Sequence, residues 1–312
     1  MRLLNNQNEM KTGIFYAAFS YILWGVLPIY WKLLGGVGSD EILANRVFWS
    51  FFFMVALLLV TKKRPLFIET FRGLAANRRQ MLALITASIL ISINWFIYIY
   101  AVNTGQMIQA SLGYYINPLV SVLLGMIFLK EKLSVWQYLS FGMAAIGVLI
   151  LTFSYGQFPW IALTLAISFG LYGLAKKLIK VEAAVGLTLE TLVVMPVAAV
   201  YMAVLFLNGT STLFNSAVVV DILLIGAGAA TAVPLLYFAR GAQSIPLSML
   251  GFLQYIAPTI TLLLGVFMYD ETFSKVHLLS FTFIWAAVTI YSVSRTKLAL
   301  NFKTRKGKGI EL

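Results

Sequence analysis

The chain has 312 residues, of which 61% are hydrophobic and only 11% are charged, whereas a typical soluble domain carries about 25% charged residues. A soluble fold needs a charged exterior, so this composition excludes an ordinary soluble domain and favours a protein surrounded by lipid. The formal net charge is +12, and the absence of cysteine excludes disulfides and thiol chemistry.

Apolar runs recur along the whole chain. A helix needs about 20 apolar residues to cross about 30 Å of hydrocarbon, and these runs are too long and continuous for barrel strands, which alternate in polarity. The first run lacks a small-residue cleavage site, so we expect a retained span and not a signal peptide. The sequence predicts an all-α integral membrane protein with ten transmembrane helices at 13–34, 41–61, 82–102, 107–129, 136–153, 158–175, 185–207, 221–239, 246–269 and 277–293.

Basic residues are distributed unequally between the two sets of connections. If the N-terminus is cytoplasmic, the outer loops contain only Lys32 and Lys275, and Arg46 lies within a span. This asymmetry fits the positive-inside rule, so we expect both termini in the cytoplasm and the basic connection 61–80 at the cytoplasmic interface. We expect the basic C-terminal tail to attract anionic lipid and not nucleic acid. The cytoplasmic set is Arg2, Lys11, Lys62, Lys63, Arg64, Arg72, Arg78, Arg79, Lys130, Lys132, Lys176, Lys177, Lys180, Arg240, Arg295, Lys297, Lys303, Arg305, Lys306 and Lys308.

Two parts of the chain resemble each other. When the sequence is shifted by 140 positions, YYINPLVSVLLGMIFLKEKLS at 114–134 aligns with QYIAPTITLLLGVFMYDETFS at 254–274 with eight identities, Pro118 with Pro258 among them. SYILWG at 20–25 similarly resembles SFGLYG at 168–173. We therefore predict two halves of five helices each, 1–154 and 155–312. Because five is odd, the second half is inverted in the membrane, as in many secondary transporters.

Enzyme chemistry has little support in the sequence. The single histidine, His277, lies near Asp270 and Glu271, and we interpret this group as interfacial polar residues. The chain has no cluster with metal-ligand spacing and no phosphate-binding loop, so we expect neither a metal nor a cofactor.

Polar, aromatic and proline residues within the spans are candidates for a substrate pathway. Pro118 and Pro258 occupy matching places and form either a paired hinge or kinks that improve packing. Amides in hydrocarbon should face inward, and aromatic residues away from the span ends indicate either an aromatic-lined central cavity or core packing. The amides are Asn94, Asn117 and Gln254, and the aromatic set is Trp24, Trp95, Tyr98, Tyr115, Tyr172 and Tyr255.

Arg46 and Glu190 are charged residues within predicted spans, at equivalent places in the two halves. Arg46 is close enough to the outer end of its span to reach the head groups. A charge inside a membrane is costly, which favours function or pairing. Three interpretations stay open: two sites at opposite ends of one pathway, a direct ion pair, or independent structural roles.

Five segments together resemble the RarD-type members of the EamA family, within the drug/metabolite transporter superfamily. They are WGVLPIYWKLL at 24–34, EILANRVFWS at 41–50, NWFIYIYAVN at 94–103, ASLGYYINPL at 110–119 and LGFLQYIAPT at 250–259. The resemblance covers nearly the whole chain and implies two five-helix EamA repeats, a bacterial-type inner membrane and export of small metabolites. The family name is associated with chloramphenicol sensitivity, which does not identify a physiological substrate.

The function expected from these features is alternating-access export of a small amphipathic metabolite or drug-like molecule. The aromatic set would supply apolar and π contacts, the amides would orient polar groups, and Arg46 would attract an anionic group. Glu190 is the candidate proton site if transport is proton-coupled. A passive channel or facilitator and a membrane-embedded lipid-modifying enzyme are the alternatives. The substrate, the energy coupling and the oligomeric state stay open.

Overall fold

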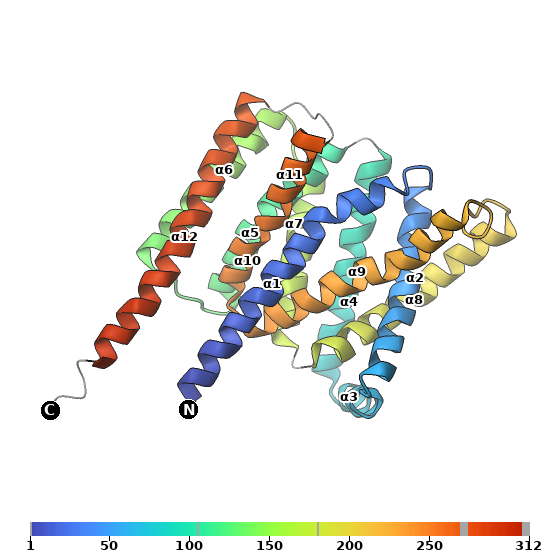
Figure 1. Ribbon diagram of the computed structural model, residues 1–312, viewed down its shortest axis with the longest axis horizontal. Coiled ribbons are helices and arrows are strands. Elements are labelled where there is room, and N and C mark those ends of the chain that lie inside the picture. Colours follow the sequence, from blue (N-terminus) through green and yellow to red (C-terminus); the bar gives the residue numbers. More distant parts are fainter. Residues whose placement is uncertain (1, 105, 180, 269–273, 308–312) are drawn as a thin grey trace.

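The computed structural model describes residues 2–104, 106–179, 181–268 and 274–307. Within these ranges the chain forms α-helices and no strand (Figure 1). In chain order they are α1 (Arg2–Lys32), α2 (Ser39–Val60), α3 (Arg64–Ala76), α4 (Arg78–Asn103), α5 (Met107–Phe128), α6 (Val135–Tyr155), α7 (Trp160–Leu178), α8 (Ala183–Leu207), α9 (Val218–Ser244), α10 (Leu247–Gln254), α11 (Ile256–Met268) and α12 (Lys275–Gly307).

The ten predicted spans are confirmed. Ten segments of the described chain are long and apolar enough to cross a membrane, so the protein is an all-α integral membrane protein. Nine of them lie in single helices, and the remaining one, Leu247–Met268, contains both α10 and α11. The first span begins earlier than predicted, at Asn8.

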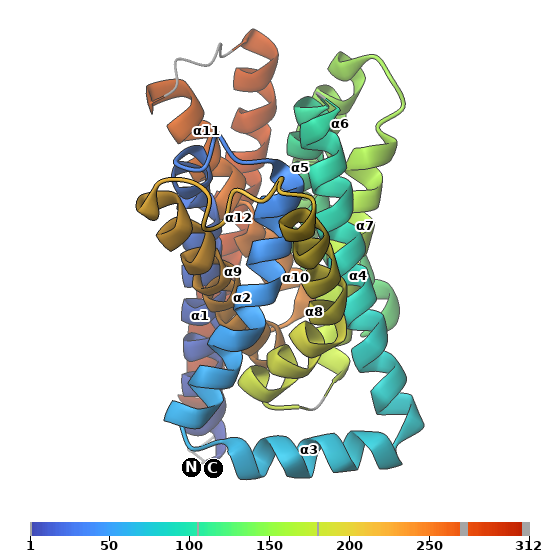
Figure 2. The same cartoon turned by 90° about the vertical axis from the view of Figure 1, so that its right-hand side faces the viewer.

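Helix α3 lies across one end of the bundle, roughly perpendicular to the spans (Figure 2). Its apolar side chains Leu66, Ile68 and Phe71 are exposed, whereas Leu74 is buried against the bundle. A helix that combines exposed apolar residues with basic ones is suited to a membrane surface. The N-terminal end of α1 and the C-terminal end of α12 lie at this same end of the bundle, which we call the α3 side (Figures 1 and 2).

The helices of the first and second halves are interleaved. Helices α6 and α12 pack against each other along one edge of the bundle, while α2, α8 and α9 lie at the other (Figure 1). Between these edges α1 packs against α9, α4 against α7, and α5 against both α7 and α10. The core therefore depends on contacts between distant parts of the sequence, and its largest fully buried side chains include Tyr172, Phe238 and Phe281.

The two prolines at matching places of the sequence have different local effects. Pro258 has no N–H to donate to the carbonyl of Gln254, and its ring crowds that carbonyl, so α10 ends at Gln254 and α11 begins at Ile256. Pro118 instead lies inside α5, which is assigned as one continuous helix. The predicted paired hinge therefore stays a prediction, and only the ninth span is divided.

Helices α2 and α9 approach each other closely at Gly228. A Cβ atom on this glycine would lie 2.3 Å from the carbonyl carbon of Trp49 and 2.6 Å from the amide nitrogen of Ser50. The Ser50 hydroxyl donates a hydrogen bond to the Gly228 carbonyl at 3.0 Å. This contact fixes the position of α2 against α9, one turn away from Arg46 and Thr231.

We expect Gly228→Ala to destabilise the protein, because the added methyl group would collide with the backbone of α2. Overpacking of this kind costs about 1 to 3 kcal/mol, and backbone atoms cannot move aside as a flexible side chain can. Thermal unfolding of the detergent-purified protein measures the effect. Gly142→Ala is the matched control, because its Cβ would meet nothing within 4 Å. Equal melting temperatures for the two variants would contradict the close approach.

Candidate functional site

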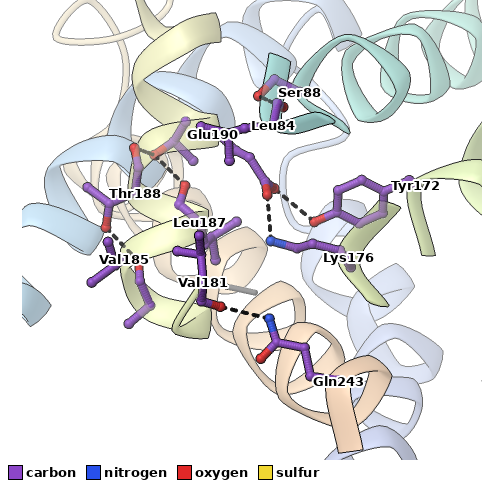
Figure 3. A network of polar contacts seen from close by, with 12 residues as sticks. Leu84, Ser88, Tyr172, Lys176, Val181, Val185, Leu187, Thr188, Glu190 and Gln243 are labelled. Atoms are coloured by element: carbon purple, nitrogen blue, oxygen red, sulfur yellow. Dashed lines mark hydrogen bonds and ion pairs between the residues drawn. The ribbon is translucent and has the colours of Figure 1, made fainter. Parts of the chain in front are cut away.

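Glu190 forms a polar centre between α7 and α8. It lies about 10 Å along α8 from the first residue of that helix. Its carboxylate accepts hydrogen bonds from Lys176 Nζ at 2.6 Å and from the Tyr172 hydroxyl at 3.1 Å, one on each oxygen (Figure 3). Tyr172 and Lys176 are four residues apart on α7, so their side chains point in the same direction. All three residues are buried, and the centre is neutral as a whole.

The position of Lys176 corrects the sequence analysis, which assigned this residue to a cytoplasmic connection. Helix α7 continues to Leu178, so Lys176 lies within the span and is only 2% exposed. An unpaired ammonium group in hydrocarbon costs several kcal/mol, and the carboxylate of Glu190 supplies the opposite charge. Lys176 and Lys177 follow an apolar run, and such a position is typical of a loop. The only sign of pairing in the sequence is the acidic residue Glu190 in the next span.

A small cavity lies beside Glu190. A water molecule's centre has about 10 Å³ available in it, which is room for about one water molecule. Small-molecule sites usually measure about 300 to 1,000 Å³, so this conformation is closed around the cavity. Two members of the predicted aromatic set, Trp95 and Tyr172, meet there. The lining consists of Val47, Ile91, Trp95, Tyr172, Leu187, Glu190, Thr191, Val194 and Leu235, from five helices.

Arg46 lies on α2 and is held by contacts from three other helices. Its Nε donates a hydrogen bond to the Thr231 hydroxyl of α9 at 3.0 Å. The guanidinium carbon lies 4.6 Å from the centre of a Trp31 ring and 5.8 Å from that of a Trp95 ring. Both distances are in the range of cation–π contacts. The contacts of Arg46 with Thr231 and Trp31 were not expected from the sequence, because residues so far apart along the chain give no signal of contact.

Arg46 and Glu190 do not pair with each other. Glu190 has Lys176 as its ionic partner, so the direct ion pair considered from the sequence is not formed. Trp95 connects the two sites, since it lines the Glu190 cavity and also lies near the Arg46 guanidinium group. Both charged side chains therefore lie in the surroundings of one indole.

The three predicted amides lie inside the bundle. Asn94 donates hydrogen bonds from Nδ2 to the Leu165 carbonyl at 2.9 Å and to the Ser168 hydroxyl at 3.0 Å, which joins α4 to α7. Gln254 accepts a hydrogen bond from Ser121 at 3.1 Å. The side-chain oxygen of Asn117 is buried without a hydrogen-bond partner among the described residues. Asn117 therefore retains a free acceptor inside the bundle. Buried polar atoms are rarely left unsatisfied, because the loss of a hydrogen bond is costly.

Tyr115 and Tyr255 bind the backbone of each other's helical segments. The Tyr115 hydroxyl donates to the Pro258 carbonyl at 3.2 Å, and the Tyr255 hydroxyl donates to the Tyr115 carbonyl at 3.4 Å. These bonds link α5 to the break between α10 and α11. Both tyrosines therefore support the region of the two prolines.

Trp24 and Tyr98 occupy two further aromatic environments. The Trp24 ring lies 5.7 Å from Phe169 and 5.6 Å from Phe238, within a cluster on α1, α7 and α9. The Tyr98 ring lies 6.0 Å from that of Tyr114, and Tyr98 is close enough to Arg46 for an electrostatic interaction. The predicted aromatic set is therefore divided between packed core and the surroundings of the two charged sites.

Glu182 anchors the first turn of α8 on the α3 side. Its carboxylate pairs with Lys63 at 2.9 Å and accepts hydrogen bonds from the N–H groups of Ala184 and Val185 at 3.0 and 3.1 Å. Burial alone would raise the pKa of Glu182, but the bonds from Lys63 and Val185 hold this pKa below its usual value. Glu182 is therefore a carboxylate at neutral pH, and it fixes the start of the helix that carries Glu190.

Two further side chains hold the connection between α9 and α10. Lys177 Nζ donates to the Ile245 carbonyl at 2.5 Å, just after the end of α9. Glu131 accepts hydrogen bonds from the backbone N–H groups of Leu247 and Ser248 at 2.6 and 2.9 Å, in the first turn of α10. A cation at a helix C-terminus and an anion at an N-terminus both complement the helix dipole. The capping role of Glu131 was not expected from the sequence.

The cluster considered for a lipid-modifying enzyme is only partly within the described chain. Asp270 and Glu271 lie outside the described residues, and His277 lies in the first turn of α12. Among the described residues no group of three or more histidine or acidic side chains is arranged to hold a metal ion.

Comparison with known proteins agrees with this architecture. The sequence model of the EamA-like transporter family matches residues 11–153. A Bacillus subtilis protein named uncharacterized transporter YojE is 50% identical and aligns over 93% of this chain and 96% of its own length. The chain belongs to the EamA-like transporter family. Protein RarD of Escherichia coli is 42% identical to this EamA-family chain and aligns over 91% of it and 94% of its own length.

A solved structure titled "Crystal structure of protein" has the same fold as this EamA-family transporter. The TM-score is 0.67 at 17% sequence identity, and the match covers 90% of this chain and 96% of the other. The family and the names of its relatives identify a multi-pass bacterial membrane transporter that acts on small molecules, which points away from an enzyme.

We expect Lys176→Met to destabilise the EamA-family transporter much more than Tyr172→Phe. The first change leaves the buried carboxylate of Glu190 without its counter-ion, at a cost of about 3 kcal/mol or more, whereas the second removes one hydrogen bond of about 1 kcal/mol. The combination Lys176→Met with Glu190→Gln removes both charges and should recover part of the loss. Thermal unfolding of the purified variants measures these differences. A double variant no more stable than Lys176→Met would refute the pairing.

Proposed function

We propose that this EamA-family transporter exports small amphipathic metabolites or drug-like molecules by alternating access. The observation that carries the proposal is the relation between its two charged sites. Arg46 and Glu190 each lie seven residues after the first residue of their helices, α2 and α8. The helices begin on opposite sides of the bundle, and the two sites meet at Trp95 in the closed core (Figure 2).

The closed core supports a mechanism in which the helices separate to admit the substrate. The cavity at Glu190 holds about one water molecule, so a metabolite enters only after helices around it move apart. We infer that the substrate pathway includes the residues named from the sequence, with Trp31 and Thr231 added beside Arg46. A channel, by contrast, would have to offer a continuous open path.

We also propose that residues 1–154 and 155–312 are inverted repeats. In this relation the helices of the two halves correspond in chain order. Helix α1 corresponds to α7, α2 to α8, α4 to α9, α5 to α10 with α11, and α6 to α12. The contact of α1 with α9 then has its counterpart in α7 with α4, and that of α2 with α9 in α8 with α4. The pairs α2 with α8, α5 with α10 and α6 with α12 contact their own counterparts. This pattern supports the repeat relation suggested by the sequence.

We place the α3 side in the cytoplasm of a bacterial cell with the protein in its inner membrane. The basic residues of α3 and the even number of spans support this orientation, and the same basic residues would attract anionic lipids. Nucleic acid is not an expected partner.

The substrate screen that tests the function uses the purified transporter and a metabolite library. A compound that binds the folded protein raises its melting temperature by mass action. Stabilising compounds are then tested for flux into liposomes, where we expect saturable uptake that is stimulated by unlabelled substrate on the other side. Unsaturable flux with ionic conductance would indicate a channel and contradict alternating access.

We propose that transport is coupled to proton movement at Glu190. We therefore expect Glu190→Gln to uncouple the two, since glutamine keeps hydrogen-bonding capacity but cannot exchange a proton. The readout is the rate of substrate-driven pH change inside liposomes, together with substrate exchange, which does not need a proton site. Glu69→Gln is the control, because Glu69 is exposed on α3. Unchanged proton movement in a correctly folded Glu190→Gln variant would remove Glu190 from the coupling mechanism.

The orientation of the protein in the membrane can be tested with single introduced cysteines, because the chain contains no cysteine of its own that would react. We expect a Thr210→Cys variant, in the exposed connection after α8, to react with a membrane-impermeant maleimide in intact cells. An Asn77→Cys variant, between α3 and α4, should react only after the membrane is permeabilised. The opposite pattern would place the α3 side outside the cytoplasm.

A further inference from the structure

The two charged sites differ in how their charge is balanced. Both oxygens of Glu190 are hydrogen-bonded, and Lys176 neutralises its charge (Figure 3). Arg46 uses its Nε for the bond to Thr231, and no acidic side chain of the described chain pairs with its guanidinium group. The ionisable groups that face Arg46 are the phenols of Tyr98 and Tyr114, which are neutral at physiological pH.

The acidic residues nearest to Arg46 in the sequence are committed elsewhere. Asp40 accepts a hydrogen bond from the hydroxyl of Tyr201. Glu41 accepts hydrogen bonds from the backbone N–H groups of Thr212 and Leu213 at 2.7 and 3.1 Å. Both carboxylates bind groups of α8 or of the connection that follows it, so neither serves as the counter-ion of Arg46.

The surroundings of Arg46 also fix what kind of molecule fits beside it. The rings of Trp31 and Trp95, at 4.6 and 5.8 Å, offer apolar faces next to the cation. The bond from Nε to Thr231 anchors the guanidinium group while leaving its two terminal nitrogens without a described partner. Those nitrogens form the planar fork that binds a carboxylate through two parallel hydrogen bonds.

We propose that Arg46 binds the carboxylate of the transported substrate, and that the substrate is a small apolar or aromatic monocarboxylate without an ammonium group. This assignment rests on the proposed transport function and specifies its substrate class. One uncompensated cation matches one negative charge, because the nearby Lys176 is already neutralised by Glu190. The same pair leaves no free carboxylate for the ammonium group of an amino acid, so the site discriminates against zwitterions.

The chemistry gives the substrate a second role as counter-ion. Arg46 is only partly exposed within its span, where an unpaired cation is costly, and a carboxylate bound at the fork lowers that cost. The indole of Trp95 would then contact the apolar part of the substrate on the side that faces the Glu190 cavity. Binding thus depends on charge at Arg46 and on apolar contact at the two indoles.

The test compares carboxylates with neutral analogues of the same shape on the purified, full-length transporter. The probes are benzoate, phenylacetate and indole-3-acetate, each against its amide, with phenylalanine as the zwitterion, and tryptophan fluorescence and thermal shift report binding. We expect at least one carboxylate to bind about tenfold or more tightly than its amide and than phenylalanine. If no carboxylate binds better than its amide, the assignment is wrong.

Variants locate the binding to Arg46. We expect Arg46→Gln to abolish the preference for the carboxylate and Arg46→Lys to weaken carboxylate binding about tenfold, because lysine keeps the charge but loses the fork. Arg46→Lys also decides the matter if Arg46→Gln fails to fold. Arg78→Gln is the control, since Arg78 is an exposed cation at the first residue of α4, about 25 Å along that helix from Trp95. Equal affinity in Arg46→Lys and the unaltered protein would overturn the proposal.

The same panel separates failure of the substrate class from failure of the transport function. If liposomes take up neutral or cationic compounds while no carboxylate exceeds its amide, the transport function stands and the carboxylate assignment is overturned. If no compound of any charge is carried, the proposed function itself is refuted.

Discussion

The cost of holding charge away from water is the constraint on which the rest of this structure depends. Glu190 lies inside a membrane span and is tolerated because Lys176 and Tyr172 satisfy both of its carboxylate oxygens. Both partners come from α7, so the pairing links α7 to α8 through side chains. An ion pair in such surroundings adds little net stability over apolar residues, but loss of one partner is severe. The presence of the Lys176–Glu190 pair in the core is therefore better explained by its positioning of the two side chains than by a gain in stability.

Backbone contact between α2 and α9 places the second charged group. Gly228 lets the backbone of Trp49 and Ser50 approach closely, and Thr231 follows one turn later on the same helix. Thr231 then accepts a hydrogen bond from Arg46 Nε, while the indoles of α1 and α4 lie 4.6 and 5.8 Å from the guanidinium carbon. The guanidinium group is thus oriented by packed helices and not by an opposite charge. This arrangement leaves the cation available for a ligand.

The sequence predicted all ten spans because the bilayer demands long apolar runs, and it found Glu190 because an acid inside such a run is rare. The partner of Glu190 was missed, because the position of Lys176 near the end of its span is also typical of a basic loop. Trp31 and Thr231 carried no signal, since their roles depend on tertiary contacts between α1, α2 and α9. The sequence also could not tell which proline divides its span. The span that contains Pro258 is divided, whereas the equivalent proline, Pro118, leaves its helix continuous.

Polar contacts join helix ends on both sides of the charged centre. On the α3 side Lys63 holds Glu182, and Glu131 caps α10, whereas on the opposite side Glu41 binds the backbone of Thr212. Contacts of this kind exchange readily with water once a helix end moves, unlike the apolar core between them. The break at Tyr255 divides the ninth span between these two regions. In the proposed mechanism one set of end contacts therefore opens while the other stays closed, and a substrate bound at Arg46 neutralises the cation throughout.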